Sequence, residues 1–396
     1  MAPERDAPAQ LLIDLSVLVQ KDDQSGIQRV VRSVLAVLQH TPPAGYRITP
    51  VYDAGGYYAY ATRFGAAATE AADAGDIAPV QVRAGDIFFG LDLCPKQVPR
   101  NAAALADLRR HGVRLHFMVY DLLPINHPEL FMAGAHAIYS EWLATVCQLA
   151  DGLVCISRAV ADDVLAWLEH HPVRRPGTLH VGYAHLGADL RMAQPTRGIN
   201  AQDQAALDGI AGRPAILMVG TLEPRKAQDQ ALAAFELLWQ RGIDASLVIV
   251  GKPGWMVDRL IERLRSHPEL GRRLFWLEHA SDEALLRLYR HSAALLAASQ
   301  AEGFGLPLIE AAQHGLPVIA RDIPVFREVG GSHAYYFDGE TAGLASALTA
   351  WLDLHAQGRA PQSGGMPHLS WQQCTQQILA CLLHQHWYRT APTLLA

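Results

Sequence analysis

The 396-residue sequence lacks the features of several protein classes. No apolar run reaches the length of a membrane span. Residues 1–10 carry charges of both signs and two prolines around no apolar core, so we expect no secretory signal there. A net charge of −6 argues against a nucleic-acid-binding protein. These absences predict a cytoplasmic protein, with peripheral association at the inner face of the plasma membrane left open.

Cysteine and metal-binding patterns are also scarce. The five cysteines are odd in number, lie in or beside apolar runs and show no close pairing, so we expect free buried thiols in a reducing compartment. The adjacent acids Asp22-Asp23 and Asp162-Asp163 sit in unrelated contexts and predict no metal site. Gly251-Lys252-Pro253 lacks the Ser or Thr that follows the lysine of a P-loop, which excludes an ATPase of that type.

The composition is that of a globular protein with more than one core. Half of the residues are hydrophobic and 18% are charged, and the chain is too long for one ordinary domain. Apolar strands alternate with amphipathic helices in both halves, which predicts an α/β fold with two Rossmann-like domains.

The most informative stretch is 299–319. Gly303 and Gly305 allow a tight loop, Pro307 suits the start of a helix, and Gly315 ends that helix. Glu302 then lies just before the helix and the second acid, Glu310, about one turn inside it, so we expect both carboxylates to face one cleft.

This arrangement suits a nucleotide sugar. Carboxylates accept hydrogen bonds from the vicinal hydroxyls of a ribose or a hexose, and the amides of residues 304–306 at the helix N-terminus attract phosphate. Taken alone, however, the two glutamates are equally compatible with a solvated loop residue and an ordinary helix residue.

The wider string, Glu-Gly-Phe-Gly-Leu-Pro-Leu-Ile-Glu-Ala, resembles the Glu-x7-Glu motif of retaining family 4 glycosyltransferases, which have the GT-B fold of two Rossmann-like domains facing a cleft. The resemblance implies that Glu302 lies at the donor sugar and phosphates and that Glu310 holds the nucleotide ribose. It also implies donor contacts by the residues just before Pro307, namely Gly303, Phe304, Gly305 and Leu306.

Two further loops extend the expected donor site. Arg225 and Lys226 follow an apolar strand at a βα turn, where adjacent cations can neutralise a diphosphate, although a surface charge pair has the same appearance. Thr221 stands where many family members have an arginine, which makes Lys226 the firmer of the two phosphate contacts. Gly26 opens a helix after a strand and loop, and its context resembles the family's Gly-Ile-x-Arg donor loop.

The stretch 116–131 resembles the His-Asp-Leu-Ile-Pro segment of bacterial polysaccharide mannosyltransferases, but Tyr120 replaces the family's histidine. We therefore expect Tyr120 and Asp121 to be catalytic-site candidates at the carboxyl end of a strand. Asp121 is equally compatible with a turn cap.

The resemblance gives the expected layout: an acceptor-side domain over 1–190, a linker over 191–212, a nucleotide-sugar-binding domain over 213–369 and a helix over 370–396 that crosses back to the first domain. It implies a retaining hexosyltransferase, with GDP-mannose as the favoured donor and a lipid-linked saccharide of a bacterial surface polysaccharide as acceptor. It implies neither a metal nor another cofactor. The alternatives are dTDP-rhamnose or a UDP-hexose as donor, a nucleotide-sugar 2-epimerase, or a binding-only relative.

Overall fold

A computed structural model describes residues 8–21, 25–64, 79–188, 196–391 and 394–395, and the chain divides into two compact units. The first unit comprises 1–125, 134–187 and 369–396. The second comprises 126–133 and 188–368. The short stretch 126–133 therefore leaves the first unit and packs with the second, which the sequence did not predict.

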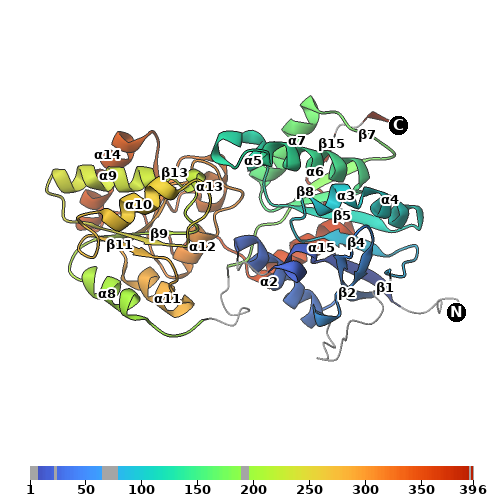
Figure 1. Cartoon of the computed structure of the whole chain (residues 1–396), viewed down its shortest axis with the longest axis horizontal. Helices are drawn as coiled ribbons and strands as arrows, with labels where there is room; N and C mark the ends of the chain where they lie inside the picture. Colours follow the sequence, from blue (N-terminus) through green and yellow to red (C-terminus); the bar gives the residue numbers. More distant parts are fainter. Residues whose placement is uncertain (1–7, 22–24, 65–78, 189–195, 392–393, 396) are drawn as a thin grey trace. The chain divides into compact units, whose positions relative to one another are not determined.

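The first unit is built on one eight-stranded sheet with the order β15-β8-β6-β5-β4-β1-β2-β3 (Figure 1). The central pairs are parallel, while β3 and β15 pair antiparallel at the two edges. Leu11, Leu12 and Ile13 of β1 are fully buried, as expected for a parallel strand covered on both faces. The strands are β1 (Ala9–Asp14), β2 (Tyr46–Asp53), β3 (Tyr58–Tyr60), β4 (Ile87–Gly90), β5 (Arg114–Val119), β6 (Gly152–Cys155), β8 (Leu179–Tyr183) and β15 (Arg389–Ala391).

Helices cover this sheet, and the last of them comes from the far end of the chain. α15, the helix expected to return to the N-terminal domain, belongs to the first unit and packs against α2. The helices are α1 (Ser16–Gln20), α2 (Gly26–His40), α3 (Gln97–Arg100), α4 (Ala102–Arg110), α5 (Leu123–Asn126), α6 (Ala135–Leu149), α7 (Arg158–His170) and α15 (Trp371–His384). A separate short pair joins β7 (Arg174–Arg175) to β16 (Leu394–Leu395).

The second unit has a six-stranded, all-parallel sheet with the order β11-β10-β9-β12-β13-β14. The chain order reverses between β9 and β12, and in such sheets the ligand binds outside the carboxyl ends of the strands at that point. The strands are β9 (Ala215–Val219), β10 (Ser246–Val250), β11 (Leu274–Leu277), β12 (Ala294–Ala297), β13 (Val318–Arg321) and β14 (Tyr335–Phe337).

The helices of the second unit form two layers. α9, α10 and α14 lie on one face of the sheet, and α8 and α11 lie on the other (Figure 1). The first layer encloses a continuous apolar core that includes Phe235, Leu264 and Trp351. The helices are α8 (Ala201–Gly209), α9 (Gln228–Gln240), α10 (Asp258–Ser266), α11 (Asp282–His291), α12 (Leu306–Gln313), α13 (Pro324–Gly330) and α14 (Thr341–Ala356).

The interval 191–212 differs from the expected linker. Residues 189–195 lie outside the described part, but Asn200 caps α8, which packs against α11 and β11. The second half of this interval is therefore a folded part of the second unit. Within the described residues, no helix is both long and apolar enough to cross a membrane.

Candidate active site

The loop from β12 to α12 places Glu302 at the carboxyl edge of the second sheet. Gly305 has φ +98° and stands at the N-cap of α12, a backbone conformation that favours glycine. A Cβ at this position would lie 2.8 Å from the ring of Phe326, so the site also lacks room for a side chain. At the other end of α12, Gly315 has φ +67° and the amide of Leu316 donates to Ala311 O, so the glycine ends the helix as the sequence predicts.

Arg225 and Lys226 reach the same edge from the neighbouring strand. They lie in a single 3-10 turn, Pro224–Lys226, between β9 and α9. Gln228 stabilises this turn, because its side-chain amide donates to Thr221 O and its carbonyl accepts from the amide of Glu223. The turn after β9 thus carries two cations, and the loop after β12 carries the carboxylate of Glu302, at the same edge of the sheet.

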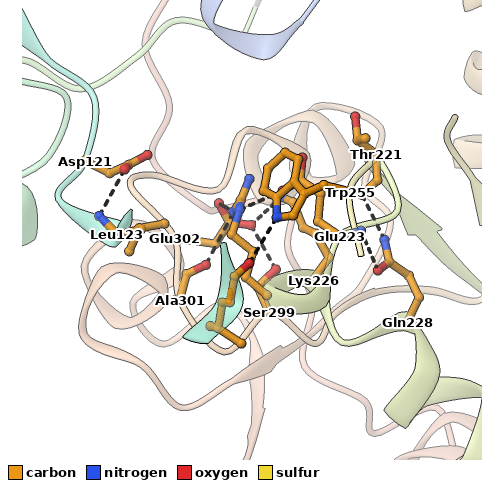
Figure 2. Close-up of polar contacts among 12 residues, drawn as sticks. Asp121, Leu123, Thr221, Glu223, Lys226, Gln228, Trp255, Ser299, Ala301 and Glu302 are labelled. Carbon is orange, nitrogen blue, oxygen red and sulfur yellow. Dashed lines mark hydrogen bonds and ion pairs between the residues drawn. The ribbon is translucent and has the colours of Figure 1, made fainter. Parts of the chain in front are cut away.

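Glu302 binds both cations. Its Oε2 lies 2.8 Å from Nη1 of Arg225, its Oε1 pairs with Nζ of Lys226, and Ser299 donates to that Oε1 over 2.8 Å. Figure 2 shows Lys226 and Ser299 converging on Glu302. The carboxylate side chain is only 9% exposed, and the two cations are 16% and 15% exposed. Such a pair, largely removed from water, interacts more strongly than a surface ion pair.

Glu223 completes the group from the other side of Arg225. Its Oε2 lies 2.7 Å from Nε of Arg225, so the guanidinium is held between two carboxylates. Two cations and two anions make the group formally neutral. A cavity of about 20 Å³ beside Glu302 and Lys226 has room for about one water molecule.

The charges fix the protonation state of Glu302. Burial by itself would raise the pKa of this carboxyl group, but Arg225 and Lys226 outweigh it and lower the pKa to about 2. Burial raises the pKa of Glu223, and its neighbouring cations oppose that rise only in part. Glu302 is therefore a permanent anion at neutral pH.

Glu310 has a different environment from Glu302. It is 4% exposed and accepts a hydrogen bond of 2.8 Å from the hydroxyl of Tyr289, which belongs to α11. The two carboxylates that the sequence predicts at one cleft thus have different partners. Glu310 binds a residue of α11, while Glu302 pairs with the β9–α9 turn.

The remaining candidates lie in the first unit. Gly26 is the first residue of α2, whose N-cap Ser25 forms a capping box with Gln28. Tyr120 is 2% exposed, and its hydroxyl donates to Leu91 O over 2.8 Å, so this geometry gives it a packing function. Asp121 accepts a hydrogen bond from the amide of Leu123, which is the turn-capping alternative.

Several residues that contact the predicted site residues were not predicted from the sequence. The only indication for Glu223 and Ser299 was their position in the sequence, two residues before Arg225 and three residues before Glu302. Tyr289 carried none, because its partner lies in another helix. Among the described residues, no group of three or more His, Cys, Asp or Glu side chains could hold a metal ion.

Comparison with known proteins identifies the second unit. Residues 202–357 match the family model of glycosyl transferases group 1. The chain carries a group 1 glycosyltransferase domain. It is also 44% identical over 373 residues, 93% of its length, to the serotype-specific mannosyltransferase WbdA of Escherichia coli.

The alignment with WbdA covers 44% of that relative, so the chain spans about half the length of such curated relatives. A second relative, the O-antigen chain mannosyltransferase B of Escherichia coli, is 30% identical over 175 residues, covering 41% of this chain and 44% of the relative. The predicted relationship to glycosyltransferases, and to polysaccharide mannosyltransferases among them, is confirmed.

Solved structures show the fold of this chain. Anabaena HepE, in complex with UDP and glucose, matches with a TM-score of 0.63 at 15% identity over 94% of this chain and 99% of its own. Sucrose-phosphate synthase from Thermosynechococcus elongatus matches with a TM-score of 0.58 at 17% identity over 94% of each chain. The predicted fold class, α/β with the two Rossmann-like domains of GT-B, is confirmed.

Proposed function

We propose that this chain is a retaining mannosyltransferase that moves mannose from GDP-mannose to a hydroxyl of a growing, lipid-linked bacterial surface polysaccharide. The observation that carries the proposal is the group formed by Glu302, Arg225 and Lys226 at the strand-order reversal of a group 1 glycosyltransferase domain. The identity to a mannosyltransferase over nearly the whole chain supports the sugar.

The group suits departure of a nucleoside diphosphate. As the bond from the sugar to the diphosphate breaks, negative charge develops on the leaving oxygen, and fixed cations lower the free energy of that transition state. Lys226 and Arg225 would supply these cations. Because Glu302 and Glu223 already hold their side chains in place, little reorganisation is needed when the diphosphate binds.

The other donor contacts follow from the loop and α12. The amides of Phe304, Gly305 and Leu306 at the helix N-terminus suit phosphate or the polar edge of the sugar. Tyr289 orients the carboxylate of Glu310 for the ribose hydroxyls, since one carboxylate can accept several hydrogen bonds. Asp121 stays a candidate for the reaction centre, whereas Tyr120 is assigned to packing.

The test is the thermal stabilisation of the whole chain by GDP, UDP, dTDP and ADP and by their common sugar conjugates. A ligand at about 100 times its dissociation constant adds roughly 2.7 kcal/mol to the free energy of unfolding. We expect GDP and GDP-mannose to stabilise the wild type and to lose most of this effect in Glu310→Ala. Stabilisation by only UDP or dTDP conjugates would contradict the donor, and stabilisation by none of them would contradict the transferase function.

A further inference from the structure

A cavity of about 850 Å³ opens in the second unit next to the Glu302 group. Its walls come from the start of α9, from residues 256–260 around the start of α10, and from the turn between β14 and α14. These elements lie on one face of the sheet (Figure 1). Glu310 and Tyr289 belong to α12 and α11, and neither lines the cavity. The cavity is thus separate from the proposed ribose contact, and its size is that of a small-molecule site.

The charged residues of the wall do not favour a phosphate. Four carboxylates and only two guanidinium groups line the cavity, namely Glu223, Asp229, Asp338, Glu340, Arg259 and Arg321. Arg321 is already occupied, because it donates hydrogen bonds to Ala298 O, Gly339 O and the side chain of Gln230. Arg225 and Arg263, which do not line the cavity, pair with Glu223 and Asp229. The two other carboxylates balance the two guanidinium groups, so the wall has no net positive charge to attract an anionic ligand.

The uncharged polar groups of the wall suit hydroxyls. Gln228, Gln230, Gln300 and Thr341 add carboxamide and hydroxyl groups to the carboxylates. The side chains of Gln300, Glu340 and Arg259 are exposed and make no hydrogen bond or ion pair with another described residue. Carboxylates and carboxamides can each bind adjacent hydroxyls, and these three side chains can turn toward a ligand without breaking an existing bond.

Part of the wall is apolar, and one segment of it is held in place. Leu130, Met256, Val257 and Leu260 line it, and Met256 is 54% exposed. The stretch 126–133 is anchored there, because Nε1 of Trp255 donates to Leu130 O over 3.0 Å and the Trp255 ring stacks on Phe131 at 5.6 Å. Figure 2 shows Trp255 in this region of the second unit. Apolar side chains and hydroxyl-binding groups in one cavity match a pyranose, which has C–H faces and a hydroxyl edge.

We propose that this cavity binds a neutral saccharide segment of the growing glycan, as a second carbohydrate site in addition to the donor site. The inference rests on the proposed function for the identity of the glycan. Glu340 and Gln300 would accept hydrogen bonds from its hydroxyls, and Met256 with Leu130 would contact its C–H faces. Such a site would hold the growing glycan near the donor between successive sugar transfers.

The experiment is calorimetric titration of the whole chain with neutral mannotetraose, with and without GDP. Glu340→Ala removes one acceptor, and Ala233→Phe fills the cavity from α9. The matched control is Glu262→Ala, an exposed glutamate of α10 outside this cavity. We expect saturable binding by the wild type and the control, a loss of about tenfold in affinity in Glu340→Ala, which corresponds to about 1.4 kcal/mol, and no detectable binding in Ala233→Phe.

Stabilisation by GDP, measured on the same samples, reports on folding and on the donor site. It should be unchanged in Glu340→Ala, and inorganic phosphate should not compete with mannotetraose. Absence of saturable mannotetraose binding by the wild type, or equal binding by Glu340→Ala and the wild type, would overturn the inference. Loss of GDP stabilisation in Glu340→Ala would do so as well, since the cavity would then belong to the nucleotide. If mannotetraose binds as expected but no nucleotide stabilises the chain, the cavity assignment holds and the proposed function fails.

Discussion

Each unit buries a carboxylate at the carboxyl edge of its sheet, and the two acquire opposite protonation states. Asp14, at the end of β1, is 1% exposed, and Glu302, after β12, has a side chain that is 9% exposed. Burial raises the pKa of Asp14 to about 7, and the nearby Asp92 and Asp53 add to the rise, while the hydrogen bonds from Ser16 oppose it. The pKa of Glu302 falls to about 2 despite burial.

The difference lies in the partners. Asp14 accepts hydrogen bonds from the amide and hydroxyl of Ser16, and its Oδ2 has no hydrogen-bond partner in the described part of the chain. Glu302 has two cations. Burial alone therefore does not decide whether a carboxylate is charged: the cation supplied by another segment does. The four predictions below test this contrast, starting with the largest effect.

Removing Lys226 should have the largest effect. Lys226→Met should lower turnover by about 10²–10³-fold, because the developing charge on the diphosphate loses a fixed cation. Initial rates of GDP release from GDP-mannose with an acceptor present would measure this. Lys96→Met, which removes an exposed lysine of the first unit, is the control and should keep full activity. Retention of wild-type turnover by Lys226→Met would remove Lys226 from the mechanism.

Neutralising the two carboxylates should affect stability very differently. Glu302→Gln removes the carboxylate that pairs directly with Lys226 in a site that is largely removed from water, and should cost about 2–4 kcal/mol in the free energy of unfolding. Asp14→Asn removes the cost of protonating this buried group on folding, which is about 2 kcal/mol at pH 5.5 because the pKa rises from 3.8 to about 7, so this variant should be more stable than the wild type. Urea unfolding of both variants at pH 5.5 makes the comparison. Equal losses would show that the partners do not set the charge state.

The two carboxylates should also give opposite dependences on pH. Between about pH 4 and 7, folded Asp14 holds a proton that the unfolded chain has released, so its contribution to stability falls as pH rises. For Glu302, the unfolded chain takes up a proton below the usual pKa of 4.5 and the folded chain does so only near its lowered pKa of about 2, so stability is lost as pH falls through this interval.

The pH dependence of stability that Asp14 causes can be measured with one variant. Between pH 5 and 7 the wild type should lose about 2–3 kcal/mol relative to Asp14→Asn, at 1.36 kcal/mol per pH unit. The variant should therefore be more stable than the wild type by a margin that grows up to about pH 7, and the two should be nearly equal only near pH 4. A difference that stays constant from pH 5 to 8 would mean that Asp14 is ionised in the folded chain throughout.

Sequence spacing predicted the local parts of this picture and missed the tertiary ones. The position of Glu302 before a helix and the adjacent cations at a βα turn were visible, because each depends on residues close together in the chain. The pairing itself joins residues 76 positions apart. The resemblance to a family placed both residues at the donor, but nothing in the sequence predicted that they pair. The fold class followed from alternating strands and helices, but nothing local indicated that 126–133 packs with the second unit.

Tyr120 illustrates the same limit. Its place at the end of β5 suggested a site residue, yet its hydroxyl is used by Leu91 O, an acceptor 29 residues away. Spacing predicts which side chains reach a sheet edge. It does not predict which of them are already satisfied by another segment, since that depends on packing across the whole unit.

The smallest effect is expected at Glu223, which shares Arg225 with Glu302. Glu223→Gln keeps the size of the side chain but weakens its hold on Nε of Arg225, so the guanidinium loses one of its two fixed partners. We expect turnover to fall about three- to tenfold, with Glu302 still anionic because Lys226 and Arg225 both stay in place. A pH–rate profile separates positioning from proton transfer: the variant should have a lower plateau but the same apparent pKa values as the wild type. Loss of an entire limb of that profile would instead make Glu223 a proton donor or acceptor. In that case, its raised pKa would matter to the reaction itself.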